Sequence, residues 1–209
     1  MANYRKSYFC ICDGQQETMY LEHVAKLIKD FPRKVVSFKC EEGDVLEKKL
    51  DYIEYDHAAL FDHDGRDQRF VESILTCDRL MKNNSKKRKK KEAIKFYHAY
   101  SNLNFDLWLL LHKQDYAKTV IHNDSYIRDV RIAYGLKKDA DIKDAGVIKT
   151  ILEQIALEDV KQAICRAEKI RANKLEEDGK KAGNSVYYGN PDFSIHEFLK
   201  MVLVDSGDW

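Results

Sequence analysis

The chain has 209 residues, of which 44% are hydrophobic and 34% charged, and its formal net charge is +1 at pH 7. These values are typical of a soluble globular protein with one full core, and they leave little room for long disordered linkers. No segment reaches the roughly 20 apolar residues that a membrane-spanning helix needs, and the first residues lack the apolar core of a secretory signal, so no membrane attachment is expected.

The N-terminal part predicts strands that alternate with helices. Residues 4–12 end in apolar side chains, which predicts a strand that enters the core. Apolar residues at helical spacing then predict a helix that ends before Pro32, because proline cannot continue the hydrogen-bond ladder. Lys34–Lys39 is short and β-branched, as expected for a second strand, and Gly43–Ile53 has the spacing of a short amphipathic helix.

The same alternation continues into the middle of the chain. His57–Phe61 is apolar almost throughout, as expected for a strand covered on both faces. Asp62–Gly65 then predicts a loop, Arg66–Met81 a helix, and Ala93–Ser101 a fourth strand. Alternating β and α elements of this length favour an α/β fold with a mostly parallel sheet and helices on both faces.

Helical patterns dominate the rest of the chain. Phe105–His112 is apolar around its whole helical wheel, which predicts a buried helix. An apolar stripe over residues 147–170 predicts one long helix or two helices broken near Leu157. We therefore expect an α/β core in residues 1–115, followed by a helical C-terminal region in residues 116–209 that packs on it.

A start signal for the last helix lies near the C-terminus. Ser194 and Glu197 have the spacing of a capping box, and Phe193 and Phe198 have the spacing of a hydrophobic staple. This pattern predicts a helix that begins after Ser194.

The cysteines do not indicate a disulfide framework, because their number is odd and their spacing shows no pairs. Cys10 and Cys12 lie two residues apart without a second Cys or His pair to complete a metal site, so we expect two buried thiols on one face of a strand. Free thiols are typical of the reducing cytoplasm, where we expect this protein. The five cysteines are Cys10, Cys12, Cys40, Cys77 and Cys165.

Carboxylates follow the predicted strands where the strands end. Asp13 follows the first strand and precedes Gly14, Asp62 and Asp64 follow the third, and Asp106 begins the buried helix after the fourth. Carboxylates gathered at one edge of a sheet repel each other, and a hard cation that prefers oxygen ligands relieves this repulsion. The pattern predicts a site for Mg²⁺, with Mn²⁺ as a substitute, that serves phosphate chemistry.

Within this site, we assign Asp13, Asp62 and Asp64 as metal ligands, with Asp13 alternatively acting as a general base. Glu17 lies one helical turn further and is a reserve candidate for either role. Asp106 either faces the same cluster or complements the dipole of its helix. Asp13 before glycine and the acids after the third strand also have the ordinary explanation of polar turns.

Four further residues are candidates for substrate binding. Asn102 either orients substrate or caps the helix that follows it, and His63 lies between the two acids that end the third strand. His112 lies on an apolar helix, where a histidine more often belongs to the core. His196 falls in the first turn of the last helix.

A run of six cations lies between the third and fourth strands. It is either a solvated loop or a source of salt-dependent affinity for nucleic acid that does not depend on sequence. The run consists of Lys86, Lys87, Arg88, Lys89, Lys90 and Lys91.

Four segments, taken together in this order and spacing, resemble the RloB family. The resemblance spans about residues 6–205, and its most specific element is the block from Ser101 to His112. The segments are Cys12-Asp13-Gly14 with Glu17-Thr18, Phe61-Asp62-His63-Asp64, Ser101-Asn102-Leu103-Asn104-Phe105-Asp106-Leu107-Trp108-Leu109-Leu110-Leu111-His112, and Asn190-Pro191 with His196-Glu197.

The resemblance implies a Toprim-like α/β core followed by helices, and a role in prokaryotic defence against phage. Related Toprim proteins are metal-dependent nucleases that cleave RNA, including tRNA, so it implies RNA as the favoured substrate. A cell must restrain such an enzyme, so we also expect an activating ligand or a regulatory protein partner.

The chain departs from the family pattern at several positions. Asp13 and Asp106 stand where the family has Glu, Leu103 stands where it has Pro, and Glu17-Thr18 reverses the order of a Thr-Glu pair. In a preorganised metal site, a misplacement of about 1 Å can lower a rate about 100-fold. Two alternatives to a nuclease therefore stay open: a non-catalytic or ligand-sensing defence subunit with a degraded site, and a phosphohydrolase of small nucleotides.

Overall fold

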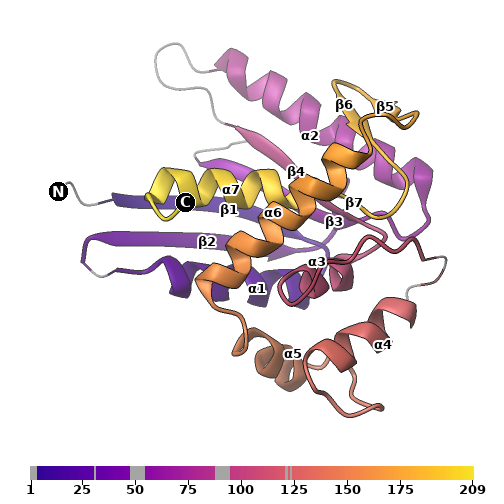
Figure 1. The fold of residues 1–209 in the computed structure, drawn as a ribbon. Coiled ribbons are helices and arrows are strands. Elements are labelled where there is room, and N and C mark those ends of the chain that lie inside the picture. The colour runs from indigo at the N-terminus through magenta and orange to yellow at the C-terminus, as the bar shows by residue number, and fades with distance from the viewer. Residues whose placement is uncertain (1–3, 31, 48–54, 88–94, 121, 123) are drawn as a thin grey trace.

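The computed structural model of the chain describes residues 4–30, 32–47, 55–87, 95–120, 122 and 124–209. A five-stranded sheet with the order β2-β1-β3-β4-β7 lies between helices on its two faces (Figure 1). β1 to β4 pair in parallel, and β7 pairs antiparallel to β4, which confirms the predicted mostly parallel α/β sheet. The strands are β1 (Tyr4–Cys12), β2 (Lys34–Glu42), β3 (Asp56–Asp62), β4 (Phe96–Asn102) and β7 (Asp192–Phe193).

Each face of the sheet has its own hydrophobic cluster. The larger cluster joins β1, β3 and β4 to α1, α3, α6 and α7, and the smaller one joins the opposite face to α2 and to a hairpin of β5 (Lys180–Ala182) and β6 (Ser185–Tyr187). The helices are α1 (Gln15–Ile28), α2 (Asp67–Lys87), α3 (Phe105–Leu111), α4 (Asp124–Ala133), α5 (Ala145–Leu152), α6 (Leu157–Asn173) and α7 (Ile195–Ser206).

The alternation of β1 explains how one strand serves both clusters. Cys10 and Cys12 belong to the larger cluster, while Ile11 belongs to the smaller one, because successive side chains of a strand point to opposite faces. Both thiols are buried and all five cysteines are free, as the sequence predicted. None of the helices in the described part of the chain is long and apolar enough to cross a membrane.

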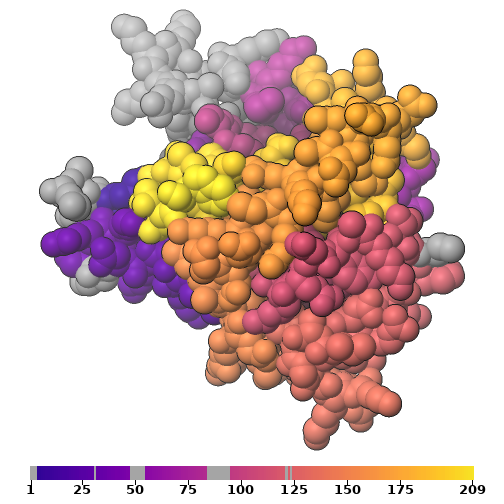
Figure 2. Space-filling view, viewed as in Figure 1, coloured from indigo at the N-terminus to yellow at the C-terminus, as the bar shows by residue number. Residues whose placement is uncertain are grey.

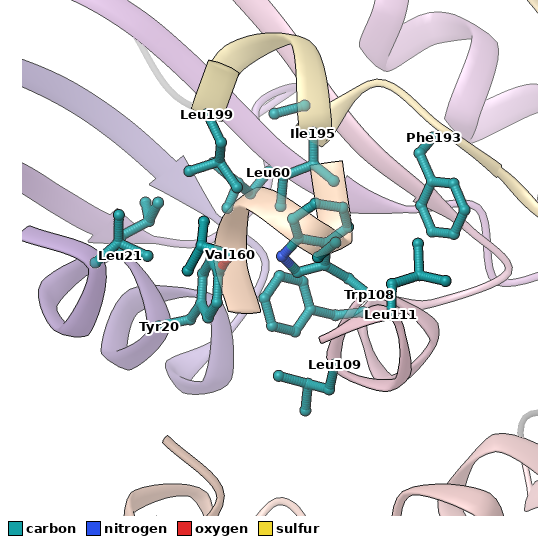
Figure 3. Packing of buried hydrophobic residues seen from close by; sticks show 14 of the residues in the cluster. Tyr20, Leu21, Leu60, Trp108, Leu109, Leu111, Val160, Phe193, Ile195 and Leu199 are labelled. Carbon is teal, nitrogen blue, oxygen red and sulfur yellow. The ribbon is translucent and has the colours of Figure 1, made fainter. Parts of the chain in front are cut away.

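The two predicted regions share one core. Trp108 of α3 is fully buried, and its ring packs against Tyr20 of α1 and Phe193 of β7, with centroid distances of 6.4 Å and 6.1 Å (Figure 3). The C-terminal region also supplies α6 and α7, which form much of one face of the molecule (Figure 2, orange and yellow). Residues 116–209 thus complete the sheet and the core of residues 1–115.

Two local predictions need correction, and a third is confirmed. Residues 43–47 form a bend and turns and do not begin the expected helix, while 48–53 lie outside the described residues. The strands β5, β6 and β7 were missed, because they are only two or three residues long and lie among helical patterns. The apolar stripe over residues 147–170 does form two helices, and the second begins at Leu157 as expected.

The start of α7 is where the sequence placed it, but the capping box is absent there. The Ser194 hydroxyl bonds to β4 instead: it accepts from the Tyr100 N–H at 3.0 Å and donates to the His98 carbonyl at 2.5 Å. Phe193 packs on Trp108, whereas Phe198 packs on Tyr8, Phe38 and Tyr97 on the same side of the sheet. Tertiary contacts therefore replace the local start signal.

Candidate functional site

A cavity of about 420 Å³ lies at the carboxyl ends of β1 and β3. Four of the five predicted catalytic carboxylates line it, together with His63, whereas Asp106 is buried nearby without lining it. The charged residues that line the cavity are Asp13, Glu17, Asp44, Asp62, Asp64, Arg66, Arg69 and Lys143.

Parallel pairing brings the first two motifs together. Cys12 at the end of β1 lies opposite Leu60 of β3, so the acids that follow each strand become neighbours. The Asp13 N–H donates to the Leu60 carbonyl at 3.1 Å, and the Asp62 N–H donates to the Asp13 carboxylate at 3.2 Å. Two short apolar strands thus suffice to place these carboxylates side by side.

The end of β4 fixes the turn that carries Asp64. The His63 N–H donates to the Ser101 carbonyl at 3.2 Å, and the Asp64 N–H donates to the Leu103 carbonyl at 3.0 Å. Asp64 itself has a φ of 49°, a left-handed conformation that Asp tolerates better than most residues, and Gly65 continues the turn with a φ of 69°. The block that begins at Ser101 therefore supports the Asp-His-Asp turn through its backbone.

Burial and mutual repulsion perturb the carboxylates. Burial, and then the charges of Glu17, Asp64 and Asp13, raise the pKa of Asp62 well above its usual range. Asp13 is exposed by surface area, yet desolvation in the cavity raises its pKa; the hydrogen bond from the Asp62 N–H opposes this shift, and the charges of Asp44 and Asp64 add to it. A perturbed cluster of this kind is typical of functional sites.

Glu17 and Asp106 are buried more deeply, with 5% and 2% of their surfaces exposed. Burial raises the pKa of Glu17 to about 7 and that of Asp106 to about 6, and the positive charge of Lys143 opposes both shifts. Asp106 Oδ2 accepts from Asn104 Nδ2 at 3.3 Å, whereas Oδ1 has no hydrogen-bond partner among the described residues. Glu17 can therefore exchange a proton near neutral pH, and it faces the cavity.

Two of the cations in the cavity are already paired. Arg66 contacts Asp64 at 3.1 Å, and Arg69 contacts Asp44. Asp44 belongs to the turn after β2, so a third segment of the sheet edge contributes to the site. The resulting surface combines acids in the interior with arginines at the rim.

The donor set suits a hard divalent cation, because it consists of carboxylate oxygens, and only Asp44 and Asp64 among these acids are paired with an arginine that the structure describes. Among the described residues, however, no three His, Cys, Asp or Glu side chains are arranged as a ready-made metal site. Mg²⁺ is commonly held by one or two carboxylates, with waters and substrate phosphates completing its shell. Asp62 and Asp64 fit that mode, and Asp13 lies beside them.

Three predicted substrate-binding residues do not line the cavity. The Asn102 side chain donates to the Tyr188 carbonyl at 2.9 Å. His112 Nε2 lies 3.0 Å from the Tyr20 hydroxyl and Nδ1 lies 2.9 Å from the Trp108 carbonyl, and burial lowers the pKa of His112 to about 4. His196 is buried in α7, where burial lowers its pKa to about 3. All three residues are therefore buried outside the cavity.

His63 is the one predicted histidine at the cavity, and its ring is fixed. Nε2 lies 2.7 Å from Asp67 and Nδ1 accepts from the Gly65 N–H at 3.1 Å, so Nε2 is the protonated nitrogen. The ring also packs on Phe70 with a centroid distance of 4.8 Å. His63 thus stiffens the turn that carries Asp64.

The cationic run lies mostly outside the described part of the chain. Lys86 and Lys87 are the last residues of α2, so the helix continues beyond the predicted end at Met81. Arg88, Lys89, Lys90 and Lys91 lie outside the described residues.

Sequence reasoning missed several residues that line the cavity. Arg66 and Arg69 follow Asp64 in the first turns of a predicted helix, and their spacing from the acids could have indicated them. Asp44 and Lys143 carry no comparable signal, because each lies in a segment that reaches the cavity only through the fold, whereas Gln16 lies between the predicted residues Asp13 and Glu17.

The RloB-like protein family model matches residues 8–201. No curated protein and no solved structure matches the chain significantly. The matched segment contains every carboxylate of the cavity as well as the strands and helices that position them. The chain therefore belongs to the RloB-like protein family.

Proposed function

We propose that this protein is a magnesium-dependent, Toprim-like nuclease of the RloB type that cleaves RNA such as tRNA in defence against phage. The observation that carries the proposal is the cavity into which β1 and β3 deliver Asp13, Asp62 and Asp64 beside a buried Glu17. Phosphoryl transfer needs positioning and charge stabilisation, and clustered carboxylates that hold a metal ion supply both.

In this proposal, Asp62 and Asp64 hold the metal and Asp13 completes the set. A bound Mg²⁺ would polarise a phosphate oxygen and lower the pKa of a water molecule. Glu17 is the better candidate for the general base, because its pKa of about 7 lets it take a proton at neutral pH. The buried charge of Asp106 contributes to the raised pKa of Glu17 and so favours the role of Glu17 as a base.

RNA is favoured over a small nucleotide because the chain carries cations that a polymer with many phosphates can contact. Arg66 and Arg69 line the cavity, and the six-cation run from Lys86 to Lys91 begins in the last turn of α2, at the end of that helix away from the cavity. Such groups add affinity for a polyanion. The proposed setting is the cytoplasm, where a regulatory protein would restrain the activity or an activating ligand would switch it on.

The test is a cleavage assay with total tRNA and plasmid DNA in Mg²⁺, Mn²⁺ or EDTA. We expect metal-dependent cutting of RNA that Asp62→Asn/Asp64→Asn abolishes. Asp139→Asn, which removes an exposed acid outside the cavity, serves as the matched control and should cut like the wild type. Cleavage that persists in EDTA or in the double variant would contradict the proposal.

A second candidate is a non-catalytic or ligand-sensing defence subunit with a degraded site. It is favoured by the lack of a ready-made three-ligand metal site among the described residues, and by Asp at positions 13 and 106 where the family has Glu. A folded protein that binds Mg²⁺ in calorimetry but cuts neither polymer would support it. Hydrolysis of nucleoside triphosphates or cyclic dinucleotides without polymer cleavage would instead support a small-nucleotide phosphohydrolase.

A further inference from the structure

Lys143 reaches the cavity from the C-terminal region, far along the chain from the carboxylates. It belongs to the segment between α4 and α5, and its side chain lines the cavity together with Asp13, Glu17 and Asp62. Neither the spacing of the motifs nor the strand ends indicated this residue. Its position is therefore a product of the way α4 and α5 pack on α3 and α1.

Several contacts fix the backbone at Lys143. The preceding residue, Ile142, is 1% exposed and belongs to the larger hydrophobic cluster. The Ile142 carbonyl accepts from Gln16 Nε2 of α1 at 3.4 Å, which ties the segment to the wall of the cavity. The Lys143 N–H donates to the Asp141 side chain at 2.9 Å, and Asp144 caps α5 through the N–H groups of Gly146 and Val147.

The ammonium group of Lys143 differs from the two arginines of the cavity. Arg66 is paired with Asp64, and Arg69 is paired with Asp44. Lys143 forms no ion pair within 4.0 Å with any acid that the structure describes, although its charge lowers the pKa of both Glu17 and Asp106. It thus lies within electrostatic reach of the buried acids while its ammonium keeps its donors for a ligand.

A phosphate group that enters this cavity meets a strongly acidic interior. Five carboxylates line the cavity, and only two of them are paired with arginines. A metal ion offsets part of the repulsion, and enzymes with two metal ions use the second one to stabilise charge on the opposite side of the reacting phosphate. A fixed ammonium group can supply the same positive charge from the protein.

We propose that Lys143 contacts the reacting phosphate of the RNA substrate and acts as the fixed cation opposite the metal-binding carboxylates. This inference rests on the proposed nuclease function and deepens it, because it names the group through which the C-terminal region completes the site. The contact involves no covalent step: the ammonium donates hydrogen bonds to a non-bridging phosphate oxygen and stabilises the charge that develops there.

The competing role for Lys143 is that of a counter-ion for Glu17 and Asp106. Loss of a counter-ion would raise the pKa of Glu17 and shift the pH–rate profile, without weakening the binding of RNA. Loss of a phosphate contact would, in addition, weaken RNA binding and lower kcat across the whole pH range. The two roles are separable by measurement.

The experiment compares the wild type with Lys143→Met, Lys143→Arg and, as the matched control, Lys137→Met, which removes an exposed lysine outside the cavity. Cleavage kinetics across pH give kcat and KM, and a 2′-O-methyl RNA that resists cleavage gives Kd in Mg²⁺. We expect Lys143→Met to lower kcat/KM by about 10- to 100-fold and to raise Kd, Lys143→Arg to stay within roughly threefold, and Lys137→Met to match the wild type. Circular dichroism verifies that each variant is folded.

The outcomes distinguish this inference from the proposed function. If the wild type cuts RNA and Lys143→Met cuts equally well, or changes only its pH–rate profile, the inference is overturned and the nuclease stands. If the wild type cuts nothing, the nuclease proposal fails. Calorimetry with pyrophosphate and Mg²⁺ then tests separately whether Lys143 contacts phosphate. Equal binding of pyrophosphate by the wild type and Lys143→Met would then overturn the phosphate contact, whereas weaker binding by the variant would support it.

Discussion

The backbone N–H of Asp62 donates a hydrogen bond to the carboxylate of Asp13 over a distance of 3.2 Å. This bond joins the first residue after β1 to the last residue of β3. One N–H does not offset the burial of these two carboxyl groups and the negative charges around them, since the pKa of both groups remains raised. The pairing of the strands therefore holds the acids together against their mutual repulsion, and the free energy of folding offsets this repulsion.

Replacing Asp62 should stabilise the protein while it removes the proposed activity. Asp62→Asn eliminates a partly buried charge that Glu17, Asp64 and Asp13 repel. We expect the free energy of unfolding to rise by roughly 1 kcal/mol, or Tm by about 2–4 °C, in metal-free protein. Differential scanning calorimetry in EDTA measures this, and an unchanged or lower Tm would show that repulsion does not strain the site.

Magnesium should stabilise the wild type but not a variant that lacks both proposed aspartate ligands. A ligand that binds only the folded state raises Tm with its concentration. We expect Mg²⁺ to raise the Tm of the wild type and to have little effect on Asp62→Asn/Asp64→Asn, because the metal loses its ligands. Thermal melts over a series of Mg²⁺ concentrations, with Ca²⁺ for comparison, provide the test. Equal shifts in both proteins would place the metal elsewhere.

The stability of the metal-free protein should fall as pH rises. Burial raises the pKa of Glu17 to about 7 and that of Asp106 to about 6, whereas the pKa of such carboxyl groups in the unfolded chain is about 4. Between these values the folded state keeps protons that the unfolded state has lost, so the free energy of unfolding decreases through this window. We expect a loss of about 2–4 kcal/mol between about pH 5 and pH 8 in urea titrations. Asp106→Asn should flatten the lower part of the curve.

His112 should prove to be a structural residue. Its two ring nitrogens lie within hydrogen-bonding distance of the Tyr20 hydroxyl and the Trp108 carbonyl, and only 2% of its surface is exposed. His112→Ala leaves the buried Tyr20 hydroxyl without this partner and should lower the free energy of unfolding by about 2–4 kcal/mol. Tyr20→Phe should cost about 1 kcal/mol.

The kinetic measurement for His112 separates stability from function. Below the melting temperature, we expect the folded fraction of His112→Ala to cleave with a KM near that of the wild type. A large rise in KM without a loss of stability would restore the sequence-based prediction that His112 binds substrate.

The buried pair of Arg171 and Asp192 should hold the C-terminal segment in place. Asp192 is fully buried, and Arg171 contacts it at 3.0 Å while also donating to the Tyr100 hydroxyl and two backbone carbonyls. Arg171→Met leaves a buried carboxylate without its cation, which should cost about 3–5 kcal/mol in chemical denaturation.

The pair of Lys200 and Glu168, 2.6 Å apart, offers a matched surface control. Both side chains are more than a third exposed, so Lys200→Met should change the free energy of unfolding by less than about 1 kcal/mol. Similar losses in both variants would mean that burial does not strengthen the Arg171 pair.

Part of the site follows from local patterns in the sequence. Apolar runs that end at Asp13 and Asp62 predict parallel strands, and parallel strands place their carboxyl ends at one edge. The register of β1 and β3 confirms this, and it brings the acids into one cavity. The apolar wheel of α3 likewise predicts its burial, since a helix that is hydrophobic all round has no face for water.

Other features depend on contacts between segments that are far apart in the chain. The same Ser194 that matches a local capping box bonds to β4, and the same His112 that lies in a family motif bonds to Tyr20. In both cases a partner from another element competes with the local pattern, and a hydrogen bond made in the buried core outweighs one made at the surface.

The sequence by itself determined the α/β alternation, the strand-end acids and the family, because periodicity and short motifs are local properties of the chain. The tertiary structure decided that Glu17 is buried with a pKa of about 7, that Arg66 and Arg69 are paired, and that Lys143 reaches the cavity. Burial and the proximity of charges arise only when distant segments pack together, so a local sequence pattern does not predict them.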